Sequence, residues 1–295
     1  MIDFESMRGK TILVDIDGTL VRDGEVSLND ESRALLARLR EFGDVYLVSN
    51  SPDDERVRVI ALDAGVEVLS GARKPSPSLV SSLDNPHERE YAVIGNQWHT
   101  DGLFARRIGA TFARVLHVRH DDDSVLTKLR YALDDALYPM RGFLGALYSY
   151  ALLIRPRHWV KNVLVFAPLF FAHGLTDTVI FGSAVVAFFT FSVFSSAMYV
   201  VNDIFDIEQD RQHSKKFFRP LPSGQVSIFG AIVTAVLLIA TGALGLVAVP
   251  ALVPIIGAYV VLNLLYSYAL KHIAVVDVIT VASFYPIRVI AGAFA

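Results

Sequence analysis

The chain contains no cysteine among its 295 residues, which excludes disulfide bonds, thiol catalysis and zinc–thiolate sites. It has no basic patch of the kind that binds nucleic acid, and its net charge of −3 gives no reason to expect nucleic acid as a partner. The N-terminus lacks the positive and then apolar pattern of a secretion signal, because Asp3 and Glu5 precede the apolar run Thr11–Val14. We therefore expect the N-terminal part of the chain to stay in the cytosol.

Charged residues are also scarce in the second half of the chain. Residues 1 to about 135 are rich in Asp, Glu and Arg, whereas residues from about 143 onward form long apolar stretches. A helix needs roughly 20 apolar residues to cross a bilayer. This length predicts five spans, near 160–174, 180–201, 227–248, 251–270 and 274–294. We expect a soluble domain at 1–135, a linker or interfacial helix at 136–157, and an all-α transmembrane domain at 158–295.

The basic residues predict how these spans are oriented. Arg155, Arg157 and Lys161 precede the first span, residues 211–219 carry four Lys or Arg, and Lys271 follows the fourth span. The loops near 173–178 and 249–251 carry none. Because basic loops face the cytoplasm, this pattern predicts an inner or plasma membrane protein whose N-terminal domain and 211–219 loop are cytoplasmic. The chain stops at or inside the fifth span, so we expect it to be part of a longer membrane protein.

The soluble half alternates short apolar runs with helical patterns. Strands are expected at Thr11–Val14, Val45–Val48, Glu67–Leu69 and Tyr91–Ile94. Helices are expected over 31–42, capped by Asn29 or Asp30, then up to about Ala64, and from Lys74-Pro75 onward. This order predicts an α/β fold with a doubly wound parallel sheet, whose ligands bind at the carboxyl ends of the strands. Asp54, Glu55 and Arg56 are expected to be solvated charges.

Polar residues follow the ends of these strands in an order that resembles the haloacid dehalogenase (HAD) superfamily. Asp15-Ile-Asp17-Gly-Thr follows the first strand, Ser49-Asn50 the second, and Gly95-Asn96-Gln-Trp-His-Thr-Asp101 the last, with Lys74 between them. The resemblance implies that Asp15 is a phosphoryl-accepting nucleophile and Asp17 the acid/base. It also implies that Ser49, Asn50 and Lys74 bind the phosphate, and that Asp15, Asp17, Asn96 and Asp101 bind Mg²⁺.

One position departs from this resemblance. The fourth motif of the superfamily usually begins Gly-Asp, and here Asn96 offers a neutral oxygen in place of a carboxylate. Little sequence separates Leu20 from Val45, so a large cap domain has no room, and an open site suits a membrane-borne phosphate ester. Two interpretations stay open: an active phosphatase, and a degenerate domain with a structural role.

A second acidic pattern lies where the second span ends. Asn202 is followed by Asp203, Asp206 and Asp210, whose carboxylates at positions i, i+3 and i+7 share one face of a continuous helix. Ionisable groups at this depth are costly and usually functional. Carboxylates there can hold Mg²⁺ against a diphosphate, and Asn202, Lys215, Lys216 and Arg219 can bind its phosphates. This pattern predicts a catalytic site at Asp203 and Asp206, with Asp210 as a third metal ligand.

The stretch resembles the UbiA superfamily of intramembrane prenyltransferases, as does the following Arg219-Pro-Leu-Pro-Ser-Gly-Gln. The segment Arg155-Pro-Arg-His-Trp-Val-Lys161-Asn162 is most similar to the branch that makes decaprenylphosphoryl-5-phosphoribose. That branch implies phosphoribosyl transfer from phosphoribosyl diphosphate to a polyprenyl phosphate, with Lys161 and Asn162 at a phosphate. The alternatives are an aromatic prenyltransferase that uses a prenyl diphosphate, and a lipid-phosphate phosphatase that its helices anchor in the bilayer.

Overall fold

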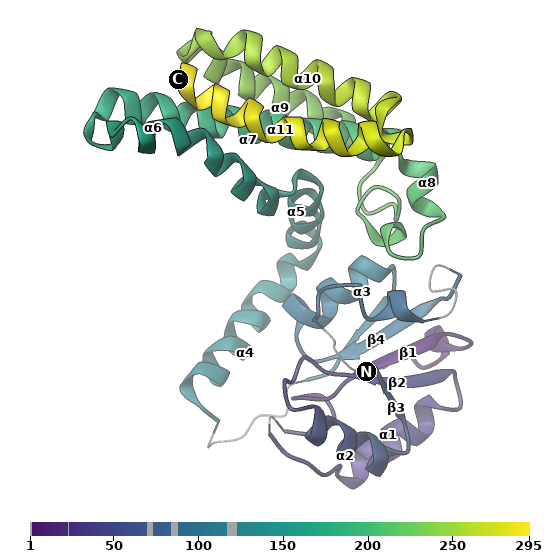
Figure 1. Ribbon diagram of the computed structural model, residues 1–295. Helices are drawn as coiled ribbons and strands as arrows, with labels where there is room; N and C mark the ends of the chain where they lie inside the picture. The colour runs from purple at the N-terminus through teal and green to yellow at the C-terminus, as the bar shows by residue number, and fades with distance from the viewer. Residues whose placement is uncertain (1, 23, 70–72, 84–87, 117–122) are drawn as a thin grey trace. The chain divides into compact units, whose positions relative to one another are not determined.

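The computed structural model describes residues 2–22, 24–69, 73–83, 88–116 and 123–295. The chain forms two compact units (Figure 1). The first unit contains Met1–Tyr148 together with Asp210–Gln225, and the second contains Ser149–Gln209 together with Val226–Ala295. Part of the predicted membrane half, the basic loop 210–225, thus belongs to the same compact unit as the N-terminal domain.

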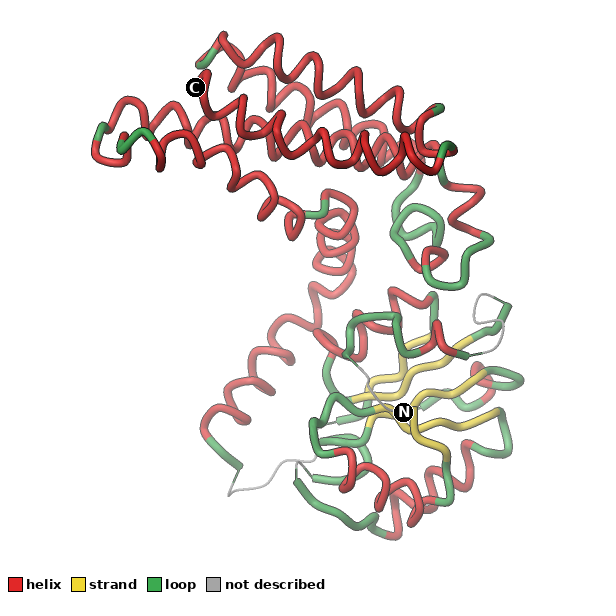
Figure 2. The backbone as a smooth tube through the Cα atoms, viewed as in Figure 1, coloured by secondary structure: helices red, strands yellow, loops and turns green. Residues whose placement is uncertain are grey.

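The first unit contains a parallel sheet of five strands, drawn in yellow in Figure 2. The strands are β1 (Thr11–Asp15), β2 (Asp44–Val48), β3 (Glu67–Leu69), β4 (Tyr91–Gly95) and β5 (Thr111–Arg114), in the order β3-β2-β1-β4-β5. The helices are α1 (Asp30–Leu39), α2 (Asp54–Ala64), α3 (Leu103–Ile108), α4 (Val125–Leu137) and the start of α5 (Arg141–Ile154). The predicted α/β sheet is therefore present, and α3, β5 and α4 are additional elements that the sequence patterns did not predict.

Helices cover both faces of this sheet. Ile12 and Val14 of β1 pack with residues of α1 and α2, whereas Leu13, between them, packs with Phe104 and Ile108 of α3. This alternation follows from the period of two along a strand. Because Asp15 pairs in register with Val48, the end of β1 lies beside the loop that follows β2. The predicted polar residues thus meet at the carboxyl edge of the sheet.

Two local expectations have different outcomes. The Asn29 side chain caps α1 by accepting from Ser32 N at 2.8 Å, which confirms that cap. The predicted helix after Lys74-Pro75 is wrong, because the described residues 73–83 form turns and a 3₁₀ helix over Val80–Ser82. The backbone N–H and carbonyl of Lys74 instead form hydrogen bonds with the Asn50 side chain.

The second unit is helical. It contains η5 (Pro156–Phe166, a 3₁₀ helix), α6 (Ala167–Phe171), α7 (Thr178–Phe205), α9 (Ile228–Ala248), α10 (Val253–Tyr268) and α11 (Ala274–Phe294); the short α8 (Ile207–Arg211) crosses the unit boundary. Phe191, Phe194 and Ala197 of α7 form its core with Tyr259 of α10 and with residues of η5 and α11. Gly292 permits the close approach of α11 to η5, since a Cβ there would lie 1.8 Å from the Val165 carbonyl oxygen.

Among the residues that the structure describes, four helices are long and apolar enough to cross a membrane. They are Thr178–Phe205, Ile228–Ala248, Pro250–Tyr268 and Ala274–Phe294, which correspond to four of the five predicted spans. The first predicted span, 160–174, is not such a helix. The 3₁₀ helix η5, which begins at Pro156, ends at Phe166, and Pro168 is the second residue of the short α6, a position where its missing N–H is tolerated.

Candidate functional site

A lysine lies between two buried carboxylates at the carboxyl edge of the sheet. Lys74 Nζ donates to Asp15 Oδ1 and, over 2.6 Å, to Asp101 Oδ1. Burial, and then the negative charge of Asp101, raise the pKa of Asp15 to about 7, although Lys74 and the Thr19 hydroxyl lower it. Burial disfavours the charged form of Lys74, but the carboxylates of Asp101 and Asp15 raise its pKa above the ordinary value. The site thus holds a carboxyl group that titrates near neutral pH against a fixed positive charge.

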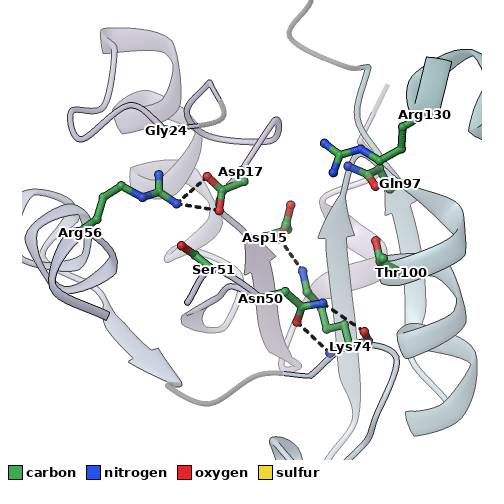
Figure 3. A pocket seen from close by; sticks show the side chains of 10 residues that line it. All are labelled: Asp15, Asp17, Gly24, Asn50, Ser51, Arg56, Lys74, Gln97, Thr100 and Arg130. Atoms are coloured by element: carbon green, nitrogen blue, oxygen red, sulfur yellow. Dashed lines mark hydrogen bonds and ion pairs between the residues drawn. The ribbon is translucent and has the colours of Figure 1, made fainter. Parts of the chain in front are cut away.

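Asp17 points toward Arg56 and not toward Lys74 (Figure 3). Arg56 Nη2 donates to both carboxylate oxygens of Asp17, at 2.7 and 2.9 Å, and Ser49 Oγ donates to one of them at 3.1 Å. The Arg56 side chain is only 9% exposed. The expectation of a solvated charge is therefore wrong for Arg56, because the first turn of α2 directs it into the site.

The two asparagines of the predicted motifs have different surroundings. Asn50 Nδ2 donates to the Lys74 carbonyl at 3.1 Å and its Oδ1 accepts from Lys74 N at 2.8 Å, so Asn50 positions the lysine. Asn96 is fully buried, and neither of its side-chain polar atoms has a hydrogen-bond partner among the described residues. An unpaired buried amide costs about 1–3 kcal/mol. Such a group in a native fold calls for a partner, for example an ion or water.

A cavity of about 390 Å³ lies at this edge of the sheet. Three basic side chains, Arg56, Lys74 and Arg130, line it together with Asp15 and Asp17 (Figure 3). The other lining residues are Gly24, Asn50, Ser51, Gln97 and Thr100. Basic groups around a nucleophilic carboxylate suit a phosphate ester, because they neutralise the phosphoryl oxygens.

The predicted magnesium ligands of this unit do not share one partner. Asp17 forms an ion pair with Arg56, whereas Asp101 forms one with Lys74. Within the described ranges, no group of three or more His, Cys, Asp or Glu is placed to hold a metal. The donors at Asp15, Asp101 and Asn96 are oxygens, and the Asn96 amide oxygen is unpartnered among those residues. That chemistry fits Mg²⁺, which prefers oxygen ligands.

Helix α4 contributes to this site, although no sequence motif marked it. Asp134 accepts from Trp98 N at 3.0 Å, His99 N at 3.1 Å and Arg114 Nη2 at 2.8 Å, and its Oδ1 lies 2.8 Å from His99 Nδ1. Burial raises the pKa of Asp134, but the hydrogen bonds from His99 and from the Trp98 backbone hold it below its ordinary value. The helix is thereby fixed to the π-helical turn Trp98–Gly102. Its amphipathic periodicity was the signal that could have revealed it.

The second acidic cluster lies in the second unit, at the end of α7. Asp203 is 2% exposed and pairs with Arg155. Asp206 pairs with Lys271 and accepts from Asn202 Nδ2 at 3.0 Å. Arg155 has a φ of +56°, a left-handed conformation that non-glycine residues rarely adopt. Strain of this kind concentrates at functional sites.

The continuous helix face expected for the three aspartates is interrupted. Helix α7 ends at Phe205, Asp206 is its C-cap, and Asp210 belongs to the first unit. There the buried Asp210 pairs with Arg219 Nη1 at 2.6 Å and with Lys216 Nζ at 3.5 Å. Two of the predicted phosphate-binding residues are thus engaged with a predicted metal ligand, and Lys215 is exposed.

A buried polar group also connects η5 with α11. Asn162 is 1% exposed; its Oδ1 accepts from Arg288 Nε at 2.8 Å and its Nδ2 donates to Ser192 Oγ at 3.0 Å. The Arg288 guanidinium lies over the ring of Phe191, 5.2 Å from the ring centre. Lys161, next to Asn162, is exposed. The structure therefore separates the two neighbouring residues that the sequence assigned to one phosphate.

Comparison with known proteins bears on the membrane region. The sequence model of the UbiA prenyltransferase family matches residues 162–295, so this part of the chain is similar to that family. Decaprenyl-phosphate phosphoribosyltransferase of Mycobacterium tuberculosis (strain CDC 1551 / Oshkosh) is 43% identical over 147 residues, which cover 48% of this chain and 49% of that protein.

Other relatives agree with this match. The decaprenyl-phosphate phosphoribosyltransferase of Corynebacterium glutamicum is 40% identical over 147 residues, which cover 48% of this chain and 44% of that protein. The nodulation protein NoeC of Azorhizobium caulinodans is 33% identical over 150 residues, or 50% of this chain and 48% of that protein. The chain spans about half the length of these relatives. The predicted resemblance of the membrane region to UbiA proteins, and to the phosphoribosyl-transferring branch, is thus supported.

Proposed function

We propose that the membrane region transfers a phosphoribosyl group from phosphoribosyl diphosphate to a polyprenyl phosphate. The observation that carries this proposal is the acidic cluster at the end of α7, where the buried Asp203 and the half-buried Asp206 are each paired with a basic side chain. The similarity to decaprenyl-phosphate phosphoribosyltransferases supports the choice of substrates.

In this reaction an oxygen of the acceptor phosphate attacks C1 of the ribose, the bond from C1 to the diphosphate breaks, and the diphosphate leaves. Mg²⁺, held by the oxygens of Asp203, Asp206 and Asn202, would neutralise the charge of the leaving diphosphate. Arg155 and Lys271 are placed to bind phosphate oxygens once the carboxylates are occupied.

The test uses the full chain in detergent, with labelled phosphoribosyl diphosphate, decaprenyl phosphate and Mg²⁺. We expect Asp203→Asn and Asp206→Asn each to lower the rate of lipid labelling by at least about 100-fold, a typical loss when one charge-stabilising group is removed. Asp177→Asn is the matched control, because Asp177 caps the opposite end of the same helix and Asn caps equally well. Equal labelling by all variants would refute the assignment.

The aromatic prenyltransferase is the second candidate, because it uses the same diphosphate chemistry. It predicts that the wild-type protein consumes a prenyl diphosphate in the presence of an aromatic acid and leaves phosphoribosyl diphosphate untouched. That outcome would replace the proposed substrates and keep the roles of the two aspartates.

We further propose that the N-terminal unit is a HAD-like phosphatase that removes the 5-phosphate from the phosphoribosyl lipid. An oxygen of Asp15 attacks the phosphorus, the ester P–O bond breaks, and the sugar oxygen leaves with a proton. Water then attacks the phosphoaspartate, which releases phosphate and regenerates Asp15. Asp17 can exchange protons in both steps only when its ion pair with Arg56 opens. Linking the two sites in one chain raises the effective concentration of the lipid at the second site.

Phosphate release from the phosphoribosyl lipid tests this second proposal. We expect Asp15→Asn to abolish release, because an amide cannot serve as the nucleophile. Asp30→Asn is the control, since Asp30 is exposed in the first turn of α1. Equal release by wild type and Asp15→Asn would remove the catalytic role, and the absence of release from both would favour a structural domain.

A further inference from the structure

Helix α4 directs a row of leucines away from the core of the first unit. The exposed fractions of four side chains at positions i, i+3, i+7 and i+11 are large: 76% for Leu126, 53% for Leu129, 54% for Leu133 and 41% for Leu137. This spacing places them on one face of the helix. They line a cavity of about 460 Å³ with His99, Thr127, Arg130 and Asp134. A contiguous apolar surface of this kind marks a binding site more often than a solvated surface.

This apolar groove adjoins the phosphate-type cavity. Arg130 lines both the cavity that contains Asp15 and Asp17 and the groove of leucines. This part of α4 is fixed in place, because Asp134, one turn after Arg130, accepts hydrogen bonds from the backbone of Trp98 and His99. The two cavities therefore lie next to each other, one lined by charged groups and the other by leucines, with Arg130 on their common border.

The chemistry of the two cavities identifies the occupant. The charged cavity offers Arg56, Lys74 and Arg130 to an anion, and the apolar groove offers leucines to a hydrocarbon. We propose that the groove on α4 binds the hydrocarbon chain of the phosphate ester whose phosphoryl group lies at Asp15. The unit then selects amphiphilic phosphate monoesters over water-soluble ones. This inference rests on the proposed phosphatase function and names its substrate class.

The test compares the hydrolysis of ethyl, hexyl and decyl phosphate by the full chain. We expect kcat/KM of the wild type to rise with chain length. The double variant Leu129→Ser/Leu133→Ser should lose about tenfold per leucine toward decyl phosphate and keep the wild-type rate toward ethyl phosphate. Leu62→Ser is the matched control, because Leu62 is 82% exposed on α2, away from the groove.

A binding measurement separates failure of the groove from failure of the phosphatase function. Trp98, whose backbone contacts Asp134 of α4, reports binding of ethyl- and decylphosphonate by fluorescence in a Trp159→Phe background. Tighter binding of decylphosphonate by the wild type than by the double variant supports the groove, even if no ester is hydrolysed. Equal affinity or equal kcat/KM for short and long chains overturns it. It is also overturned if the leucine substitutions weaken only adsorption to phosphatidylglycerol vesicles and leave chain-length selectivity unchanged.

Discussion

Replacement of Gly18 by alanine should destabilise the first unit more than the same change at Gly9. Both glycines have a φ of +74°, a conformation that costs an alanine roughly 1–2 kcal/mol. A Cβ on Gly9 would meet nothing within 4 Å, whereas a Cβ on Gly18 would lie 2.2 Å from Asn96 Nδ2 and 2.8 Å from Tyr131 Oη. Overpacking of a buried site typically adds about 1–3 kcal/mol. We therefore expect the free energy of unfolding to fall by about 1–2 kcal/mol for Gly9→Ala and by about 2–5 kcal/mol for Gly18→Ala.

Urea unfolding followed by tryptophan fluorescence measures this difference. The chain has two tryptophans, so a Trp159→Phe background leaves the signal of the buried Trp98 in the first unit. With a slope of about 2 kcal/mol per molar urea, the two midpoints should differ by about 0.5–1.5 M.

A double-mutant cycle checks the cause of the difference. Adding Asn96→Ala to Gly18→Ala removes the atom that lies 2.2 Å away, so the double variant should be more stable than the sum of the single effects predicts. Equal midpoints for Gly9→Ala and Gly18→Ala, or strictly additive effects with Asn96→Ala, would refute the close packing of Asn96 on the Asp15–Thr19 loop.

Three other predictions follow from particular contacts. The folded-state pKa of Asp134 lies below its unfolded value of 3.8, so its carboxylate stabilises the fold above that pH and loses this effect as pH falls through the folded pKa. The difference in free energy of unfolding between wild type and Asp134→Asn should therefore be full at pH 7 and shrink below 3.8. Urea titrations that give the same difference at every pH would contradict this prediction. Phe218 is 1% exposed in the core with Leu13 and Phe104, so Phe218→Ala should cost about 3–5 kcal/mol and speed trypsin cleavage after Lys215 and Lys216, whereas Phe229→Ala, at an exposed site, should not. Because the chain has no cysteine, a cysteine introduced at Gln212 should be labelled only from the cytoplasmic side and one at Thr176 only from the other side; the reverse pattern would overturn the orientation.

Local patterns predicted much of the fold, although not α3, β5 or α4. The apolar β-branched runs predicted β1, β2, β3 and β4, and the length of the apolar stretches predicted the four long membrane helices. Each of these features depends on residues that are neighbours in the chain, because strand and helix periods are short-range. The same reasoning placed Asp15 at a strand end, and thus at the edge of the sheet where ligands bind.

The partners of the charged groups required the tertiary structure. Asp17 meets Arg56, Asp203 meets Arg155, and Asp206 meets Lys271 across long stretches of chain, and no periodic pattern records such pairs. The helix interruption at Asp206 and the burial of Asn96 without a partner among the described residues likewise depend on packing. The sequence by itself determined the strands β1 to β4, the four long apolar helices and the position of Asp15 at a strand end. Only the fold decided which cation neutralises each carboxylate, since that depends on distances between elements that the chain order does not encode.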